Sequence, residues 1–561
     1  MSNKIKKSAR NWGGVFGALV FSVLALLSLQ AAAGTLADDI SIDIRALSLG
    51  NAVTADPPGI SAIHYNPAGL ANLEGREADF QGLGVLFALN GQYSAPAGYN
   101  IFGYSDDPVV CSDTPNVHAT CTNFVTSQSK AKGVALYVPF LDKIVEMPAG
   151  PLFAPLASFS IKPPGSKFTF ANGFYIPMAG GYYRSASDPG DFWGKDVSLE
   201  RFTYLSPSIG FKATDTLSLG MSVGLSYQAV AIDQEFRSPN DLLGVARLIN
   251  DSVCPPFRGQ NNFVVDLFLF GFCNAQKGIG PFDSLASLQI SMTQSLSPTY
   301  NLGVLWQPSD DFAWGAVFQS GSQMHLVGHY TINYGEGVQD VFNSVGSSPT
   351  GAILLAVLGL PGYVPPSQSG TASMNLMYPA HFKTGIKWYI LPDLKWNFDL
   401  GWSQYGAWKD MTFTFANPPA VLQIAHLLSP DATSTSLTLP LGLRDVWNWG
   451  TGFEYTWNNR IHLRAGYEWR PGALADSKRT PLLPINNANL YGVGLGYKYD
   501  KDTDIDLSAA YIYSHDSIPA DTSTNANSTS LTNIIYNPYA GLDIKTAARV
   551  TIMGIAYRTR W

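Results

Sequence analysis

Apolar and polar residues alternate along most of the chain, from about residue 77 to the end. The clearest segment is 217–227, where Leu, Met, Val and Tyr take every second position and Ser and Gly fill the positions between them. The same pattern recurs over 396–403, 461–469 and 505–514, with Tyr or Trp near the segment ends. A period of two predicts β-strands with one apolar and one polar face.

Short turns and long connections join these strands alternately. The short turns are rich in Pro, Asn and Asp and lie at 163–165, 213–215, 308–311, 392–393, 458–459 and 500–502. The long connections run over 90–150, 184–198, 235–294, 334–373, 413–441, 472–487 and 517–547. Six turns and seven loops predict an all-β fold, an antiparallel barrel of about fourteen strands. Short turns and both termini then lie in the periplasm, and long loops lie outside the cell.

Composition supports a membrane barrel over a soluble β-sandwich. The chain of 561 residues would ordinarily suggest several domains, but the uniform pattern fits one large barrel. Aromatic residues make up 12% and charged residues only 14%, with 53 glycines and 27 tyrosines. Aromatic girdles around a polar interior are typical of transmembrane barrels. The net charge of −7 without a basic patch argues against nucleic-acid binding.

The first residues have the form of a secretory signal peptide. Four basic residues in the first ten precede an apolar run over 15–29, which is short for a membrane span. Small residues follow, and we expect cleavage after Ala33, with Ala37 as second choice. The predicted organisation is therefore a signal peptide at 1–33, an N-terminal plug at 34–75 and a transmembrane barrel at 76–561.

The segment 65–73, YNPAGLANL, stands just before the first alternating strand. Asn66 can cap a helical turn, and Pro67 suits its first position because proline lacks the N–H that would be unpaired there. With Asp56 upstream, Asn66, Pro67 and Ala68 resemble the N-terminal hatch of the FadL/TodX family, outer-membrane channels for long-chain fatty acids and other hydrophobic compounds. The resemblance extends along the mature chain through three weaker motifs, at 402–405 (WSQY), 442–445 (GLRD) and 511–515 (YIYSH).

Two long loops show helical spacing of apolar residues. One helix is predicted to begin with a cap and a proline at 238–239, and a second apolar run covers 353–360. In the family, helices of the corresponding loops form a first greasy groove for ligand, while the alternative is that they only pack on each other as a lid. The candidate ligand-binding residues of these loops are Leu242, Val245, Ile249, Leu354 and Leu358.

Pro177 interrupts the third strand, followed closely by Gly180 and Gly181. Proline removes a hydrogen-bond donor from the ladder, and a closed barrel has no edge strand to tolerate the loss. We therefore expect a bulge or a local opening of the wall here. Members of the family have an inward kink in this strand that makes a lateral opening. The sequence is therefore compatible with two interpretations, a plain bulge and a functional gate.

The four cysteines form two near pairs, Cys111 with Cys121 and Cys254 with Cys273, in loop-like sequence. An even number in a secreted chain predicts disulfides. Zinc is the alternative, but the pairs lack C-x-x-C spacing and neighbouring histidines. We expect neither a metal nor a cofactor.

No catalytic residue is predicted either. The segment 220–224 has the G-x-S-x-G form of a serine hydrolase, but Ser222 stands in mid-strand, whereas that chemistry needs a strand, a sharp turn and a helix.

The expected ligand depends on charge. Fatty-acid members of the family carry a basic residue where the fifth strand enters its loop and another at a later strand. Here Gln234 or Glu235 falls at the first position, with Arg237 slightly beyond, and Leu439 falls at the second. Since a buried carboxylate without a cation is costly, this favours a neutral alkane or aromatic hydrocarbon. A register error of one residue would restore Arg237 and the fatty acid.

The leading hypothesis is a monomeric, non-enzymatic channel in the outer membrane of a Gram-negative bacterium for passive uptake of hydrophobic small molecules. The expected partners are the ligand, outer-membrane lipid and lipopolysaccharide, and the barrel assembly machinery, which would read the terminal aromatic residue Trp561. The alternative is a structural or adhesive surface barrel with no transport role.

Overall fold

The computed structural model describes the residues 38–97, 128–138, 141–148, 152–186, 188–237, 252–257, 270, 273, 284–483, 486–533 and 537–561. Several predicted features lie outside the described residues: the signal peptide, Cys111, Cys121, Leu242, Val245, Ile249 and the side chain of Arg237.

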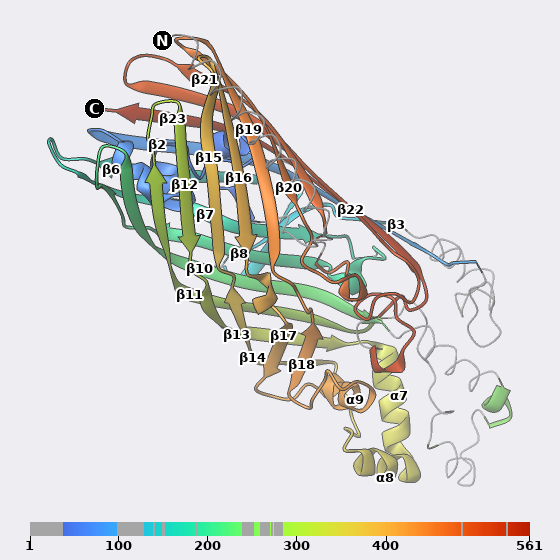
Figure 1. Ribbon diagram of the computed structural model, residues 1–561. Helices are drawn as coiled ribbons and strands as arrows, with labels where there is room; N and C mark the ends of the chain where they lie inside the picture. The colour runs from blue at the N-terminus through green and yellow to red at the C-terminus, as the bar shows by residue number, and fades with distance from the viewer. Residues whose placement is uncertain are drawn as a thin grey trace, which may run out of the picture.

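Fourteen antiparallel strands close into one barrel (Figure 1). Several barrel strands are interrupted, so that two consecutive segments form one strand. In order, they are β2 (Arg76–Ser94), β6 (Leu152–Ile161), β7 (Phe168–Tyr183), β8 with β9 (Asp196–Leu205, Ser208–Lys212), β10 (Leu217–Arg237), β11 (Ser284–Trp306), β12 with β13 (Phe312–Gln319, Ser322–Tyr334), β14 with β15 (Ser367–Tyr378, His381–Leu391), β16 with β17 (Leu394–Ser403, Asp410–Phe415), β18 with β19 (Ser436–Pro440, Val446–Asn458), β20 (Ile461–Arg470), β21 (Ala488–Lys498), β22 (Thr503–Ile518) and β23 (Asp543–Arg560). The barrel closes where β23 pairs with β2 along its whole length.

The predicted strand count and the six short turns are confirmed, because each turn joins two paired strands. The turns and the C-terminus lie at one end of the barrel, and the loop helices lie at the other (Figure 1). The helix expected around 353–360 is α8 (Pro349–Leu358), which follows α7 (Glu336–Ser347). Among the described helices, none alone is long and apolar enough to span a membrane, and α7 with α8 meets that measure only as a pair bent by 107°.

Two of the long connections contain elements that were not predicted. The first connection contains β3 (Gln128–Lys130) and the hairpin of β4 (Gly133–Val138) and β5 (Lys143–Pro148), which packs against the barrel wall. The fifth connection contains α9 (Ala420–Leu428). Both were read as plain loop, and that reading was wrong because tertiary packing, which a local pattern does not contain, stabilises these short elements.

The outer face of the barrel carries large apolar side chains. Met221, Leu302 and Ile555 are each about half exposed, at 45%, 46% and 54%. A continuous apolar exterior of this kind is stable only against another apolar phase, which here is the hydrocarbon of the membrane. On the last strand, the neighbouring Arg558 points inward and bonds to Asp79 at 2.9 Å, so that strand has the predicted apolar and polar faces.

The N-terminal segment fills part of the barrel interior. It consists of β1 (Asp38–Ser41), α2 (Ile44–Ser48), η1 (Gly59–Ser61), α3 (Ala62–Tyr65) and η2 (Pro67–Asn72). We call the described residues 38–75 the hatch. Asn66 caps η2 by accepting a hydrogen bond from the Ala68 amide at 3.2 Å, with Pro67 in the first turn, so the predicted cap is confirmed. The turn is a 3-10 helix.

Inward-facing glycines let the barrel wall touch the hatch backbone. A Cβ on Gly220 would overlap the carbonyl group of Pro67, and a Cβ on Gly303 would overlap the Asn66 side chain. Further wall glycines that approach the hatch backbone in the same way are Gly210, Gly315, Gly450, Gly452, Gly466 and Gly492. The hatch therefore packs directly against the wall on many sides.

Candidate functional site: hatch, lumen and wall

Hydrogen bonds fix the hatch to the wall. The Asp399 carboxylate on β16 accepts from the Val53 and Thr54 amides at 2.9 and 2.8 Å and from the Thr54 hydroxyl at 2.6 Å. Asn66, which is fully buried, donates through Nδ2 to the carbonyls of Thr54 (2.8 Å) and Val304 (3.0 Å). Asn66 thus both caps its own turn and ties that turn to β11. The sequence indicated only the cap.

Ion pairs add to this attachment. Asp39 lies 2.5 Å from the Lys383 ammonium and 2.8 Å from His64. Burial alone would raise the pKa of Asp39, but Lys383 and His64 outweigh it and hold the pKa well below its usual range. Asp56 lies 2.6 Å from Lys395, and burial is again outweighed by Lys395 and Arg45, so its pKa falls to about 2. Both carboxylates are therefore ionised at neutral pH and hold the hatch electrostatically.

The serine of the apparent hydrolase motif also helps to attach the hatch to the wall. The Ser222 hydroxyl donates to the carbonyl of Ile63 in the hatch at 2.8 Å. Asn301 donates to the same carbonyl at 3.1 Å. The small residues of this part of β10 thus make room for the hatch and bond to it.

The wall is incomplete beside β7. Strand β6 pairs with β7 only through 157–161 and 170–174, and beyond that point the edge of β7 pairs with the hatch strand β1, at Ile176 and Met178. The register with β8 shifts between Tyr175 and Met178, at Pro177. A cavity of about 310 Å³ lies where β6, β7 and the hatch meet. Its lining includes Leu156, Ser158, Gly173, Tyr175 and Ile42. We call this place the wall gap.

The two predicted glycines of β7 lie beyond the wall gap. Gly180 pairs with Leu199 of β8. Gly181 lies under the β4–β5 hairpin, since a Cβ there would overlap the Ala135 carbonyl oxygen. The hairpin packs through Tyr137 on Ala229 and Ala231 of β10. Gly181 therefore allows close contact between the wall and this hairpin, a use that the sequence did not indicate.

A larger cavity lies in the lumen towards the loop end. Its volume, including the part open to solvent, is about 630 Å³, and most of its lining is apolar. Leu439 of β18 and Gln234 of β10, the two positions where basic residues were considered, both face it. The other lining residues are Trp193, Ile232, Phe236, Leu288, Ile290, Phe413, Leu437, Thr480, Leu482 and Asn525. We call it the upper cavity.

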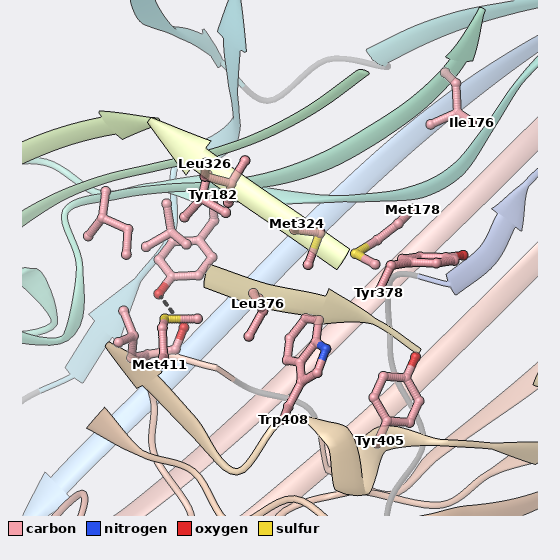
Figure 2. Packing of buried hydrophobic residues seen from close by; sticks show 14 of the residues in the cluster. Ile176, Met178, Tyr182, Met324, Leu326, Leu376, Tyr378, Tyr405, Trp408 and Met411 are labelled. Carbon is pink, nitrogen blue, oxygen red and sulfur yellow. Dashed lines mark hydrogen bonds between the residues drawn. The ribbon is translucent and has the colours of Figure 1, made fainter. Parts of the chain in front are cut away.

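Packed apolar side chains occupy the lumen beside the kinked strand. Figure 2 shows Ile176, Met178 and Tyr182 of β7 with Met324 and Leu326 of β13 and with residues of β14 and β17. Tyr182 donates to the carbonyl of Leu482, a residue that also lines the upper cavity, at 3.1 Å. This cluster therefore extends from the upper cavity to the edge of β7 at the wall gap.

The loop end exposes further apolar surface. On α8, Ile353 and Val357 are 64% and 77% exposed, Leu358 is exposed and Leu354 is half-buried. Cys254 and Cys273 form a disulfide, which confirms that predicted pair.

These features define a class: a transmembrane barrel plugged by its own N-terminus, with apolar cavities and an interruption in the pairing of its wall strands. Residues 23–561 match the family described as "Outer membrane protein transport protein (OMPP1/FadL/TodX)", and the chain belongs to this family. It is an outer-membrane protein of a Gram-negative bacterium, from a family of transporters for hydrophobic compounds. The predicted resemblance is thereby confirmed.

Solved structures of the same fold are similar along almost the whole chain. A FadL homologue from Pseudomonas aeruginosa has a TM-score of 0.63 at 17% identity and covers 94% of this chain and 100% of its own. The toluene transporter TodX from Pseudomonas putida has a TM-score of 0.56 at 14% identity, covering 92% and 97%. The toluene transporter TbuX from Ralstonia pickettii has a TM-score of 0.54 at 16% identity, with the same coverage. No curated protein matches the chain.

Proposed function

We propose that this protein is a channel for passive uptake of hydrophobic small molecules, hydrocarbons or long-chain fatty acids, which leave the barrel sideways into the membrane. The wall gap carries this proposal. In a closed barrel each strand normally pairs along both edges with wall strands, because an unpaired backbone group facing hydrocarbon costs several kcal/mol. Here the edge of β7 pairs with the hatch strand β1 beside a cavity, and a displacement of the hatch would open it.

The proposed path begins at the exposed apolar residues of α8, where Leu354 and Leu358 would contribute to a loop groove. It continues through the upper cavity past Leu439 and along the cluster beside β7. It ends at the wall gap. Each step offers apolar contact, so a lipophilic solute would not have to return to water between steps.

The hatch blocks a direct aqueous bore, which favours the sideways route over a porin. We propose that Asn66, Pro67 and Ala68 keep the hatch in place and that a small displacement near them widens the passage. Pro177, Gly180 and Gly181 would keep the β7 edge from pairing with β6. Two relatives are described as toluene transporters, and we extend hydrocarbon uptake to this chain on that basis.

We also propose an oligomeric state and partners for the barrel. We infer that the barrel acts as a monomer without enzymatic activity, that its apolar exterior contacts lipid and lipopolysaccharide, and that the barrel assembly machinery reads Trp561. The hatch is assigned to 34–75 after removal of a signal peptide at 1–33.

A substitution that fills the wall gap tests the proposal. Ser158 lines the gap and is half-buried, so Ser158→Phe should place a phenyl ring in the passage. Ser517→Phe, at an exposed position of β22, is the matched control. We would measure uptake of radiolabelled toluene and oleate by cells that lack other channels of this family, at equal surface levels.

Ser158→Phe should reduce uptake strongly, and Ser517→Phe should leave it unchanged. Equal uptake by both variants would contradict the sideways route. No uptake by the unmodified protein would favour a structural or adhesive barrel.

A further inference from the structure

Arg201 of β8 is a buried cation inside the lumen. Its side chain is only 1% exposed. The guanidinium donates to the Ser297 hydroxyl at 3.2 Å, to the Ser297 carbonyl at 3.1 Å and weakly to Thr299 at 3.5 Å, and it stacks over the Tyr378 ring at 4.3 Å. No carboxylate in the described part of the chain forms an ion pair with it.

Four other buried cations of the barrel differ in this respect. Lys383, Lys395, Arg464 and Arg558 each have a carboxylate oxygen within 2.9 Å. Burying a charge without a partner costs several kcal/mol even after relaxation. A guanidinium has more N–H donors than the three bonds found here use. Arg201 thus lacks the close carboxylate partner that these four cations have.

A cavity adjoins Arg201. Arg201 lines a cavity of about 280 Å³ with Tyr175, Pro177, Gln319 and Tyr378. This cavity shares His64 and Tyr175 with the wall gap. It also touches the apolar cluster through Tyr378, which packs with Met178 and Leu376 (Figure 2). One end of the cavity is therefore cationic and polar, and its neighbourhood is apolar.

Among the described residues, no carboxylate lines this cavity. Asp39 of the hatch bonds to His64, which also lines the cavity, and to Lys383. A guanidinium with free donors in a sheltered site binds a carboxylate through two parallel hydrogen bonds, which is its strongest neutral-pH interaction in proteins.

We propose that Arg201 binds the carboxylate of an amphipathic acid, a fatty or aromatic acid, whose apolar tail lies against the Met178–Tyr378 side of the lumen just before the wall gap. This inference rests on the proposed function and deepens it. It adds an acid to the neutral ligand expected from the sequence, because a cation that could compensate a carboxylate stands on the fourth barrel strand and not at the positions of Gln234 and Leu439.

The test compares an acid with its ester. Lauric acid and methyl laurate are measured at neutral pH against the full-length barrel in lipid nanodiscs, by equilibrium dialysis with radiolabelled probes. The unmodified protein should bind the acid at least about ten-fold more tightly than the ester, as expected for hydrogen bonds to a charged group. Arg201→Met should abolish that preference and keep ester binding. Arg460→Met, at an exposed turn residue, should keep the preference.

A purely structural role for Arg201 predicts a different result. Without ligand, Arg201→Met should melt at the same or a higher temperature than the unmodified barrel, since it removes an unpaired buried charge. Arg201→Lys keeps the charge but loses the paired geometry, so it should show an intermediate preference, and this variant serves if the methionine variant does not fold.

Equal binding of acid and ester by the unmodified protein, or an unchanged preference in both Arg201 variants, would overturn the carboxylate site and leave hydrophobic uptake standing. Binding of neither probe, together with absence of toluene uptake, would overturn the proposed function as well.

Discussion

The contact between wall glycines and the hatch makes a quantitative prediction for Gly220→Ala. A Cβ at this position would overlap the backbone of Pro67, which cannot rotate away as the end of a flexible side chain could. Forcing an extra methyl group into a packed interior costs about 1–3 kcal/mol. Because the strain disappears when the hatch leaves the wall, it should lower the free energy of local hatch opening by that amount. Opening should become about 5- to 150-fold more frequent.

Gly82→Ala is the matched control. Gly82 is also in a barrel strand, but the nearest atom to its added Cβ is the Ile555 Cγ2 atom at 4.0 Å. Both substitutions restrict the unfolded chain equally, an effect of about 0.4–1 kcal/mol that cancels in the comparison.

Amide hydrogen exchange followed by mass spectrometry would measure this, on hatch peptides covering 59–73 in the folded barrel. We expect faster exchange of these peptides in Gly220→Ala only, while both variants stay heat-modifiable on a gel. Equal exchange in Gly220→Ala and Gly82→Ala would refute the idea that the wall glycines hold the hatch in contact.

Three further predictions concern the hatch and the loops. Asn66→Ala combined with Pro67→Ala should leave the barrel folded but reduce lipophilic uptake, since the bond to Val304 is lost; unchanged uptake at equal surface level would contradict this. The pKa of Asp56 is lowered to about 2, so its pairing stabilises the protein fully above about pH 4 and loses that effect as the pH falls towards 2. The difference in melting temperature between the unmodified protein and Asp56→Asn should therefore shrink over that range, and a constant difference would count against the ion pair. Reduction of Cys254–Cys273, which are separated by 19 residues, should remove about 3 kcal/mol of loop constraint, speed exchange in 252–257 and leave the barrel intact.

The strands and turns could be predicted because their signal is local. In 217–227 the apolar residues face lipid and the Ser and Gly residues face inward, so the period of two is visible in the sequence. The Pro- and Asp-rich turns mark where the chain reverses. Strand number and orientation follow from these two signals alone.

The alternating pattern identifies the inward-facing glycines of the wall, but it does not identify the hatch residues that they contact. Inward glycines such as Gly220 and Gly303 occupy positions where small polar residues would also satisfy a polar interior. Gly220 and Gly303 contact Pro67 and Asn66 because segments far apart in the sequence lie together in the fold. The alternation of apolar and polar residues does not encode such contacts.

Arg201 was missed for a similar reason. An arginine on the polar face of a barrel strand is ordinary, and its sequence neighbours do not indicate whether a carboxylate stands opposite. Only the three-dimensional arrangement of β8, β11 and β14 leaves this side chain beside Ser297 and Tyr378 without an acid. The hairpin of β4 and β5 was not predicted for the same reason, since its partners Ala229 and Ala231 lie almost a hundred residues further along the chain.

We propose that a hydrophobic molecule leaves the barrel through the wall gap beside β7. A crystal structure with a brominated alkane would test it directly, because anomalous scattering locates the bromine without reference to the protein. We expect bromine peaks in the upper cavity and at the wall gap, between Leu156 and Tyr175. A peak between the hatch and the wall on the periplasmic side, with none at the gap, would contradict the account.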